Sequence, residues 1–70
     1  MTFRHHFSKD IYQARKQLGL TQQQVSEKMN MSLRGYQKIE KGEVRPTTEH
    51  FIRLVLIFHI QVEDYREDVF

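Results

Sequence analysis

Four polar or cationic side chains recur at helical spacing in the middle of the chain. They are Arg34, Gln37, Lys38 and Lys41. At positions i, i+3, i+4 and i+7 they would form one outward stripe of a helix. Guanidinium, amide and ammonium groups are the groups that contact base edges and phosphates in a nucleic-acid groove. The alternative interpretation is an ordinary solvated helix face, because a charged stripe alone specifies no partner.

Two consecutive short helices are predicted to position this stripe. Thr21 is a good N-cap with Gln24 at its N3 position, which together make a capping box. Asn30 can adopt the left-handed conformation that ends this helix, and Ser32 can cap the next one. Gly42 then supplies the usual C-terminal glycine. Two helices joined by a tight turn in a basic segment favour the nucleic-acid interpretation.

The apolar residues of the two helices have the spacing of a packed core. Val25 and Met29 lie four apart on one face, and the small Ser26 allows close approach of another helix. On the second helix Tyr36 and Ile39 face inward, opposite the polar stripe. Packing residues and contact residues are thus predicted on different sides.

This motif, at about residues 21–41, resembles the helix-turn-helix of the Cro and C1-repressor type of protein, the Xre family. The resemblance includes Arg15 before the motif and Arg45-Pro46 after it, and it extends from about Ile11 to Tyr65. It implies an all-α fold, a five-helix lambda-repressor-like DNA-binding domain. We expect the whole chain, residues 1–70, to be this single domain.

The resemblance also implies roles for individual residues. The base-reading positions are Leu33, Arg34, Gln37 and Lys38. Gln22 stands where the family commonly holds a phosphate, and Lys41 and Arg45 are expected to contact phosphates beyond the second helix. Arg15 and Glu40 match a family pairing between the opening helix and the end of the recognition helix.

Two residues depart from the family pattern. Gly35 falls inside the recognition helix, where glycine costs about 1 kcal/mol relative to alanine. It either lets the backbone approach DNA closely or is a tolerated weak position. Leu33 cannot hydrogen-bond a base, so it either touches a thymine methyl group or turns toward the core.

Composition excludes several other classes of protein. The chain has 70 residues and no cysteine, which excludes disulfides and thiolate metal sites. Its longest apolar run, Leu54 to Phe58, is far short of the ~20 residues that span a bilayer. We find no signal peptide, phosphate loop, catalytic carboxylate pair or metal-ligand spacing among its histidines. We therefore expect a cytoplasmic bacterial or phage protein that is not an enzyme and has no cofactor, metal or small-molecule ligand.

Charge is unevenly distributed along the chain. Residues 1–48 hold nine lysines and arginines against four acidic residues, whereas residues 49–70 hold two against five. This asymmetry would orient the protein on a polyanion, although segments this short also differ by chance.

The remaining segments are predicted to support the motif. Ser8 can cap an opening helix in which Ile11, Ala14, Arg15 and Leu18 share one face and which Gly19 ends. Before it, residues 1–7 form a candidate arm. This arm is disordered, follows the DNA backbone through Arg4, His5 and His6, or packs on a partner through Phe3 and Phe7.

A fourth helix is predicted from the Thr47 cap to about Phe58, with a left-handed stop at His59 and a short final helix at Val62–Tyr65. The fourth helix is apolar nearly all round, which indicates either a central position or a protein contact. The dimer candidates are Ile52, Leu56, Val62, Tyr65 and Phe70.

The sequence therefore predicts a sequence-specific, double-stranded-DNA-binding regulator, most simply a homodimeric repressor at a twofold-symmetric operator. One alternative is an antitoxin or another protein-interaction module, in which the C-terminal half binds a protein partner and DNA binding is secondary. A controller of a restriction-modification system is a third candidate, which shares the first mechanism.

Overall fold

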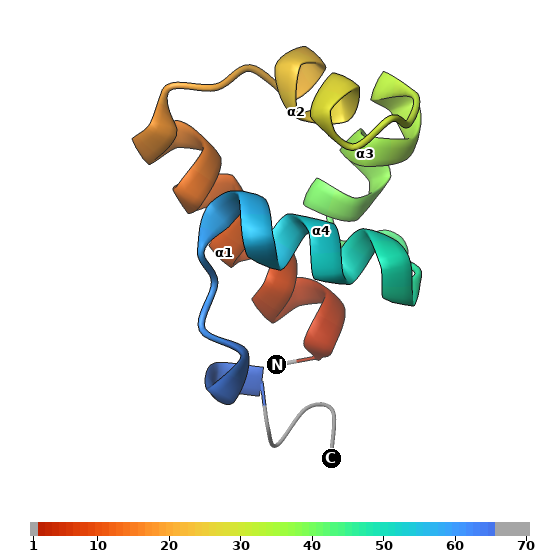
Figure 1. Ribbon diagram of the computed structural model, residues 1–70. Helices are drawn as coiled ribbons and strands as arrows, with labels where there is room; N and C mark the ends of the chain where they lie inside the picture. Colours follow the sequence, from red (N-terminus) through yellow and green to blue (C-terminus); the bar gives the residue numbers. More distant parts are fainter. Residues whose placement is uncertain (1, 66–70) are drawn as a thin grey trace.

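The computed structural model describes residues 2–65, and over these residues the chain is helical and contains no β-strand. The helices are α1 (Phe3–Leu18), α2 (Gln22–Lys28), α3 (Leu33–Glu40), α4 (Thr48–Phe58) and a final 3₁₀ helix, η1 (Val62–Tyr65) (Figure 1). The all-α prediction is confirmed. The count of five helices is not, because the last segment forms a single short 3₁₀ turn, the form that such brief segments often take.

The helix caps of the central motif form as predicted. The hydroxyl of Thr21 accepts from the amide of Gln24, whose side chain in turn accepts from the amide of Thr21 at 2.8 Å. Ser32 caps α3 through the amide of Gly35. Asn30 and Gly42 both have positive φ, 55° and 77° respectively. Side-chain caps therefore set the beginnings of α2 and α3, and residues with positive φ follow their ends.

The first helix begins at Phe3 and is therefore longer than predicted from a cap at Ser8. Thr2 caps it through the amide of His5, and the Ser8 hydroxyl donates to the carbonyl of His5 instead of capping. The prediction of a flexible arm is wrong for Phe3–Phe7, which form the first turns of α1. Packing explains the difference: the ring of Phe3 stacks on Phe7 at 5.5 Å and lies 5.7 Å from Phe51. Met1 lies outside the described residues.

The core is made of apolar side chains from every helix. Its fully or nearly fully buried members are Phe7, Ile11, Val25, Met29, Tyr36, Ile39, Leu54, Phe58 and Tyr65. Ser26 is also buried, as its small size predicted. Leu18 is instead 52% exposed, because the last residue of α1 extends beyond the packed elements.

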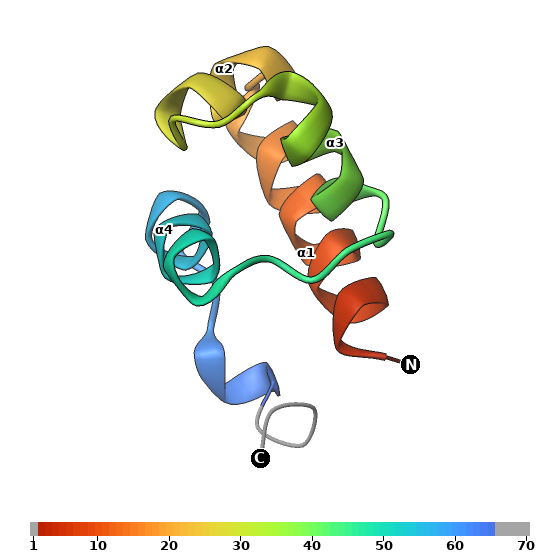
Figure 2. The ribbon, with the colours of Figure 1, turned by 90° about the vertical axis from the view of Figure 1, so that its right-hand side faces the viewer.

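Helix α1 contacts both α3 and α4 (Figure 2). Helix α3 also packs on α2, and α4 approaches α1 from a different direction. The chain then returns to the beginning of α1, where the hydroxyl of Tyr65 donates to the carboxylate of Asp10. Tyr65 is fully buried there, so its assignment as a dimer candidate is wrong. Phe70 lies outside the described residues.

Helix α4 is only partly covered by the rest of the domain. Leu54 and Phe58 are buried, whereas Ile52 and Leu56 are 52% and 69% exposed. A central position for α4, one of the two interpretations of its apolar sequence, is therefore excluded. No helix among the described residues is long and apolar enough to cross a membrane.

We expect Thr21→Ala to lower the free energy of unfolding by about 1 kcal/mol, because it removes one half of the capping box. Thr48 provides a matched control, since it is the first residue of α4 and the cap there is Thr47. Thr48→Ala should change stability by less than about 0.5 kcal/mol. Chemical denaturation followed by circular dichroism measures both, and equal losses would contradict the capping role.

Candidate nucleic-acid interface

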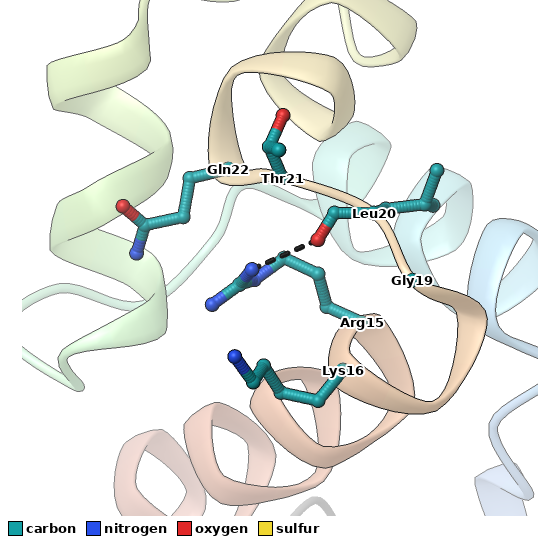
Figure 3. A pocket seen from close by; sticks show the side chains of 6 residues that line it. All are labelled: Arg15, Lys16, Gly19, Leu20, Thr21 and Gln22. Atoms are coloured by element: carbon teal, nitrogen blue, oxygen red, sulfur yellow. Dashed lines mark hydrogen bonds between the residues drawn. The ribbon is translucent and has the colours of Figure 1, made fainter.

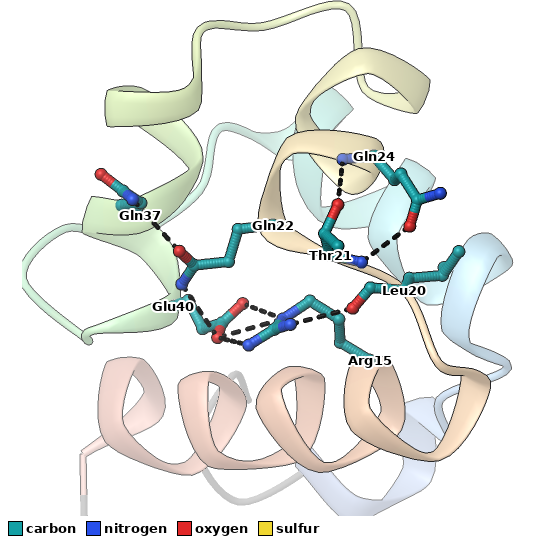
Figure 4. Close-up of polar contacts among 7 residues, drawn as sticks. All are labelled: Arg15, Leu20, Thr21, Gln22, Gln24, Gln37 and Glu40. Atoms are coloured by element: carbon teal, nitrogen blue, oxygen red, sulfur yellow. Dashed lines mark hydrogen bonds and ion pairs between the residues drawn. The ribbon is translucent and has the colours of Figure 1, made fainter.

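A buried ion pair joins α1 to the end of α3. The Nε of Arg15 donates to both carboxylate oxygens of Glu40, at 3.2 and 3.0 Å, and its Nη2 lies 2.8 Å from Oε1 (Figure 4). The two side chains are only 10% and 5% exposed. The resemblance described above implies this pairing, and the structure brings the two residues together in the bidentate geometry that best offsets desolvation.

The same guanidinium also holds the turn before α2. Its Nη1 donates to the carbonyl oxygen of Leu20 at 2.9 Å, so one side chain connects α1, the α1–α2 turn and α3. The hydrogen bond to Glu40 raises the pKa of Arg15, against the opposing effect of burial. Burial would raise the pKa of Glu40, but the neighbouring hydrogen-bond donors, Arg15 first among them, and the charge of Arg15 together outweigh it and hold that pKa below its ordinary value. Both groups are therefore charged near neutral pH.

A chain of hydrogen bonds leads from the ion pair to the exposed side of α3. The side-chain Nε2 of Gln22 donates to Oε1 of Glu40 at 3.2 Å. The Nε2 of Gln37 donates to Oε1 of Gln22 at 3.1 Å (Figure 4). Gln22 and Gln37, which the sequence assigned to phosphate and base contacts respectively, thus hold each other in place before any nucleic acid is present.

The predicted stripe of α3 lines a shallow polar depression of about 110 Å³. It is bounded by Arg34, Gln37, Lys38, Lys41 and Glu43. Arg34 and Lys41 are exposed and the other two stripe residues are half-buried. Glu43 is an acidic member of this surface that was not predicted from the sequence. It folds back toward α3, where its amide donates to the carbonyl of Lys38.

Arg45 is not among the residues that line this depression. Its guanidinium lies over the ring of Phe3, 4.8 Å from the ring centroid, beside a groove between the start of α1 and α4. The sequence did not indicate this contact, because Phe3 was placed in a candidate arm rather than in a helix.

The two unusual residues of α3 occupy its first turn. Leu33 is half-exposed and is not part of the core cluster. A Cβ added at Gly35 would lie 3.0 Å from the Oγ of Ser32 and 3.2 Å from the Cε of Met31. This Oγ accepts the capping hydrogen bond from the amide of Gly35. The absence of a side chain at Gly35 therefore leaves room for the capping side chain of Ser32. Neither of the two interpretations drawn from the sequence includes this local packing reason.

A second depression, of about 410 Å³, lies where α1 meets α2. Its lining includes Lys16, Thr21 and Gln22, together with Arg15 and Leu20, which are joined by a hydrogen bond (Figure 3). Lys16 was not among the contact residues predicted from the sequence. The signal was present, since Lys16 is a cation in the last turn of α1 directly before the motif. The lysine and the Gln22 amide together make this depression suited to an anion.

The described residues contain no group of three or more histidine, cysteine or acidic side chains arranged to hold a metal ion. The polar side chains that line the two depressions are mostly cations and amides, together with the hydroxyl of Thr21 and the carboxylate of Glu43. These groups suit a polyanion with hydrogen-bonding edges, such as a nucleic acid.

Comparison with known proteins gives one match. A family model described as helix-turn-helix, of the Cro/C1 type, matches residues 11–65, which is more than half of the chain. The comparisons with curated proteins and with solved structures find no match. The matched range agrees with the extent of the resemblance seen in the sequence, from Ile11 to Tyr65.

We expect Glu40→Gln to lower the free energy of unfolding by about 3 kcal/mol or more, because Arg15 is left buried without a countercharge. Glu49→Gln is the matched control. Glu49 also pairs with an arginine, Arg53, at 3.0 Å, but on the surface, so its loss should cost less than about 0.5 kcal/mol.

The ion pair also predicts the direction of a pH effect. Because the pKa of Glu40 is lowered by folding, its contribution is fully present above the ordinary value of 4.5 and is lost as the pH falls through the folded value. Wild-type protein should lose stability on acidification, and Glu40→Gln should flatten that profile. Denaturant unfolding between about pH 7 and about pH 3 measures both, and parallel profiles would contradict the role of the pair.

Proposed function

Because this chain belongs to the Cro/C1-type, Xre-like helix-turn-helix family, a family of DNA-binding regulators rather than enzymes, we propose that it is a sequence-specific transcriptional regulator. In its most specific form, the proposal is a homodimeric repressor that binds a twofold-symmetric operator in the cytoplasm. We also propose that the four α-helices and η1 correspond to the five helices of the lambda-repressor-like fold. The observation that carries the proposal is the polar outer side of α3, anchored from beneath by Arg15 and Glu40.

We propose that α3 enters the major groove and reads base edges. Arg34 would bind guanine through its guanidinium, and the amide of Gln37 would bind adenine. Lys38 would contribute a further donor, and Leu33 would touch a thymine methyl group. The support for Gln37 is its hydrogen bond to Gln22, because a side chain held in one orientation loses less conformational entropy when it binds.

Phosphate contacts would flank these base contacts. Gln22 begins α2 and is hydrogen-bonded to Glu40, Lys41 follows α3 directly, and Arg45 lies in the loop after it. Lys16 is added to this group because it lines the same depression as Gln22. These contacts would position the protein on the duplex without selecting a sequence.

The proposed dimer would use the exposed apolar side chains of the C-terminal half. Ile52, Leu56 and Val62 are all at least 44% exposed, and the groove beside Ile52 has a volume of about 370 Å³. Burying such side chains in a second copy would remove them from water. In a dimer on a twofold site, the two copies of α3 would be spaced by one turn of DNA, about 34 Å.

The same apolar surface supports the second candidate, a protein-interaction module such as an antitoxin, in which it would bind a different protein. A restriction-modification controller would share the proposed DNA mechanism. The oligomeric state separates the dimeric regulators from the module, since the module would present Ile52 and Leu56 unpaired in the isolated protein.

We expect Arg34→Ala to lower discrimination between operator variants by roughly 1–3 kcal/mol, because the substitution removes a base contact. Arg45→Ala should weaken binding to all sequences alike. Operator sequences are obtained by selecting bound duplexes from a random pool, and titrations of both variants on selected and random DNA measure the effects. An equal loss on both kinds of DNA for Arg34→Ala would remove its base-reading role.

We expect wild-type protein to sediment as a dimer at micromolar concentration. Leu56→Glu should raise the dissociation constant of the dimer by roughly tenfold or more, because it places a charge in the apolar contact. Leu18→Glu is the matched control, since Leu18 is an exposed leucine of a different helix, at the end of α1. A monomeric wild type would contradict the dimer and favour the protein-interaction module.

A further inference from the structure

The beginning of α1 lies against the loop that follows α3. The Nη1 of Arg4 donates to the carbonyl oxygen of Glu43 at 3.5 Å, joining positions 39 residues apart in the sequence. In Figure 2 the first turns of α1 lie below this loop, on the same side of the molecule as α3, whereas α4 lies on the other side. Residues of the first turn of α1 are thus next to the end of the proposed DNA-binding surface.

A close approach at Gly42 fixes this arrangement. Gly42 is buried and has a φ of 77°. A Cβ at this position would lie 3.0 Å from the Cδ2 of His5, 3.2 Å from the Oγ of Ser8 and 3.5 Å from the carbonyl oxygen of Arg4. The absence of a side chain therefore lets α1 pack directly against the loop, in contact with the residue that follows Lys41.

The charges around this contact favour an anion. Arg4 and Lys41 are exposed cations, His5 is also exposed, and the first turn of α1 contains no acidic residue. Glu43 is the acidic residue that faces them, in the depression that Arg34, Lys38 and Lys41 also line. The first acidic residue along α1, Asp10, accepts the hydrogen bond from Tyr65.

We propose that the first turn of α1 is a further phosphate-binding segment of the DNA interface and that Arg4 is its principal contact. This inference rests on the proposed function, because it extends the same surface. A guanidinium carries five N–H donors, and the one directed at Glu43 orients the others. The first turn would thus bind a phosphate beyond those contacted by α3 and its loop, and it would lengthen the footprint on the duplex.

The test compares Arg4→Ala with Arg53→Ala, an exposed arginine on α4. Both are titrated with duplexes selected by the wild type and with random duplexes of equal length, at about 50 and about 200 mM salt. Losing one phosphate contact lowers the salt slope by about 0.9. Arg4→Ala should therefore weaken binding to both kinds of DNA alike. The loss of affinity of Arg4→Ala relative to the wild type should be roughly 3.5-fold smaller at the higher salt concentration than at the lower one. Arg53→Ala should bind with the wild-type affinity at both.

Arg4→Lys separates charge from structure, because it keeps the cation and changes the hydrogen-bond geometry. We expect it to retain most of the wild-type salt slope, and we expect all three variants to unfold within a few degrees of the wild type. Three outcomes would overturn the inference: a salt slope unchanged in Arg4→Ala, a loss confined to selected DNA, or a loss that follows reduced thermal stability. If wild-type protein binds DNA normally, such a result removes the contribution of Arg4 alone. If the wild type does not bind DNA, the proposed function itself fails.

Discussion

The buried contact between Arg15 and Glu40 is the interaction on which the rest of the structure depends. Helix α3 has eight residues, too few to be stable as an isolated helix in water. Its orientation must therefore come from tertiary contacts. Tyr36 and Ile39 bury one side of the helix, and the ion pair locks its last turn to α1. Removing two charges from water is costly, and only the bidentate geometry, with further bonds to Leu20 and Gln22, offsets that cost.

The parts of the fold that the sequence could predict are those determined by neighbouring residues. The capping box at Thr21, the cap at Ser32 and the left-handed residues Asn30 and His59 all act within one turn of helix, so their effect can be derived from local sequence. The burial of Val25, Met29, Tyr36 and Ile39 follows from periodicity in the same way. The extent and the candidate residues of the α3 surface were predictable for this reason.

The remaining features depend on contacts between distant segments. Helix α1 begins at Phe3 because aromatic rings from α4 and η1 cover the ring of Phe3. The guanidinium of Arg45 in turn lies over the ring of Phe3. The bond between Gln22 and Gln37 joins two helices across 15 residues. Lys16 and Arg4 become neighbours of the candidate site only once α1 is docked. Periodicity assigns a residue to a face, but it does not indicate which distant segment packs there.

The position of Tyr65 has a consequence for how the domain is assembled during synthesis. Its ring closes the aromatic cluster around Phe3 and Phe7, and its hydroxyl bonds Asp10, 55 residues earlier in the chain. Helices α1, α2 and α3 emerge from the ribosome before α4 and η1, so the contacts among them, such as that between Arg15 and Glu40, can form first. The aromatic cluster is completed only after residue 65 has emerged from the exit tunnel. Until then the nascent chain exposes apolar rings in the first turns of α1, and this is the stage of synthesis at which a chaperone or a second nascent chain has access to them.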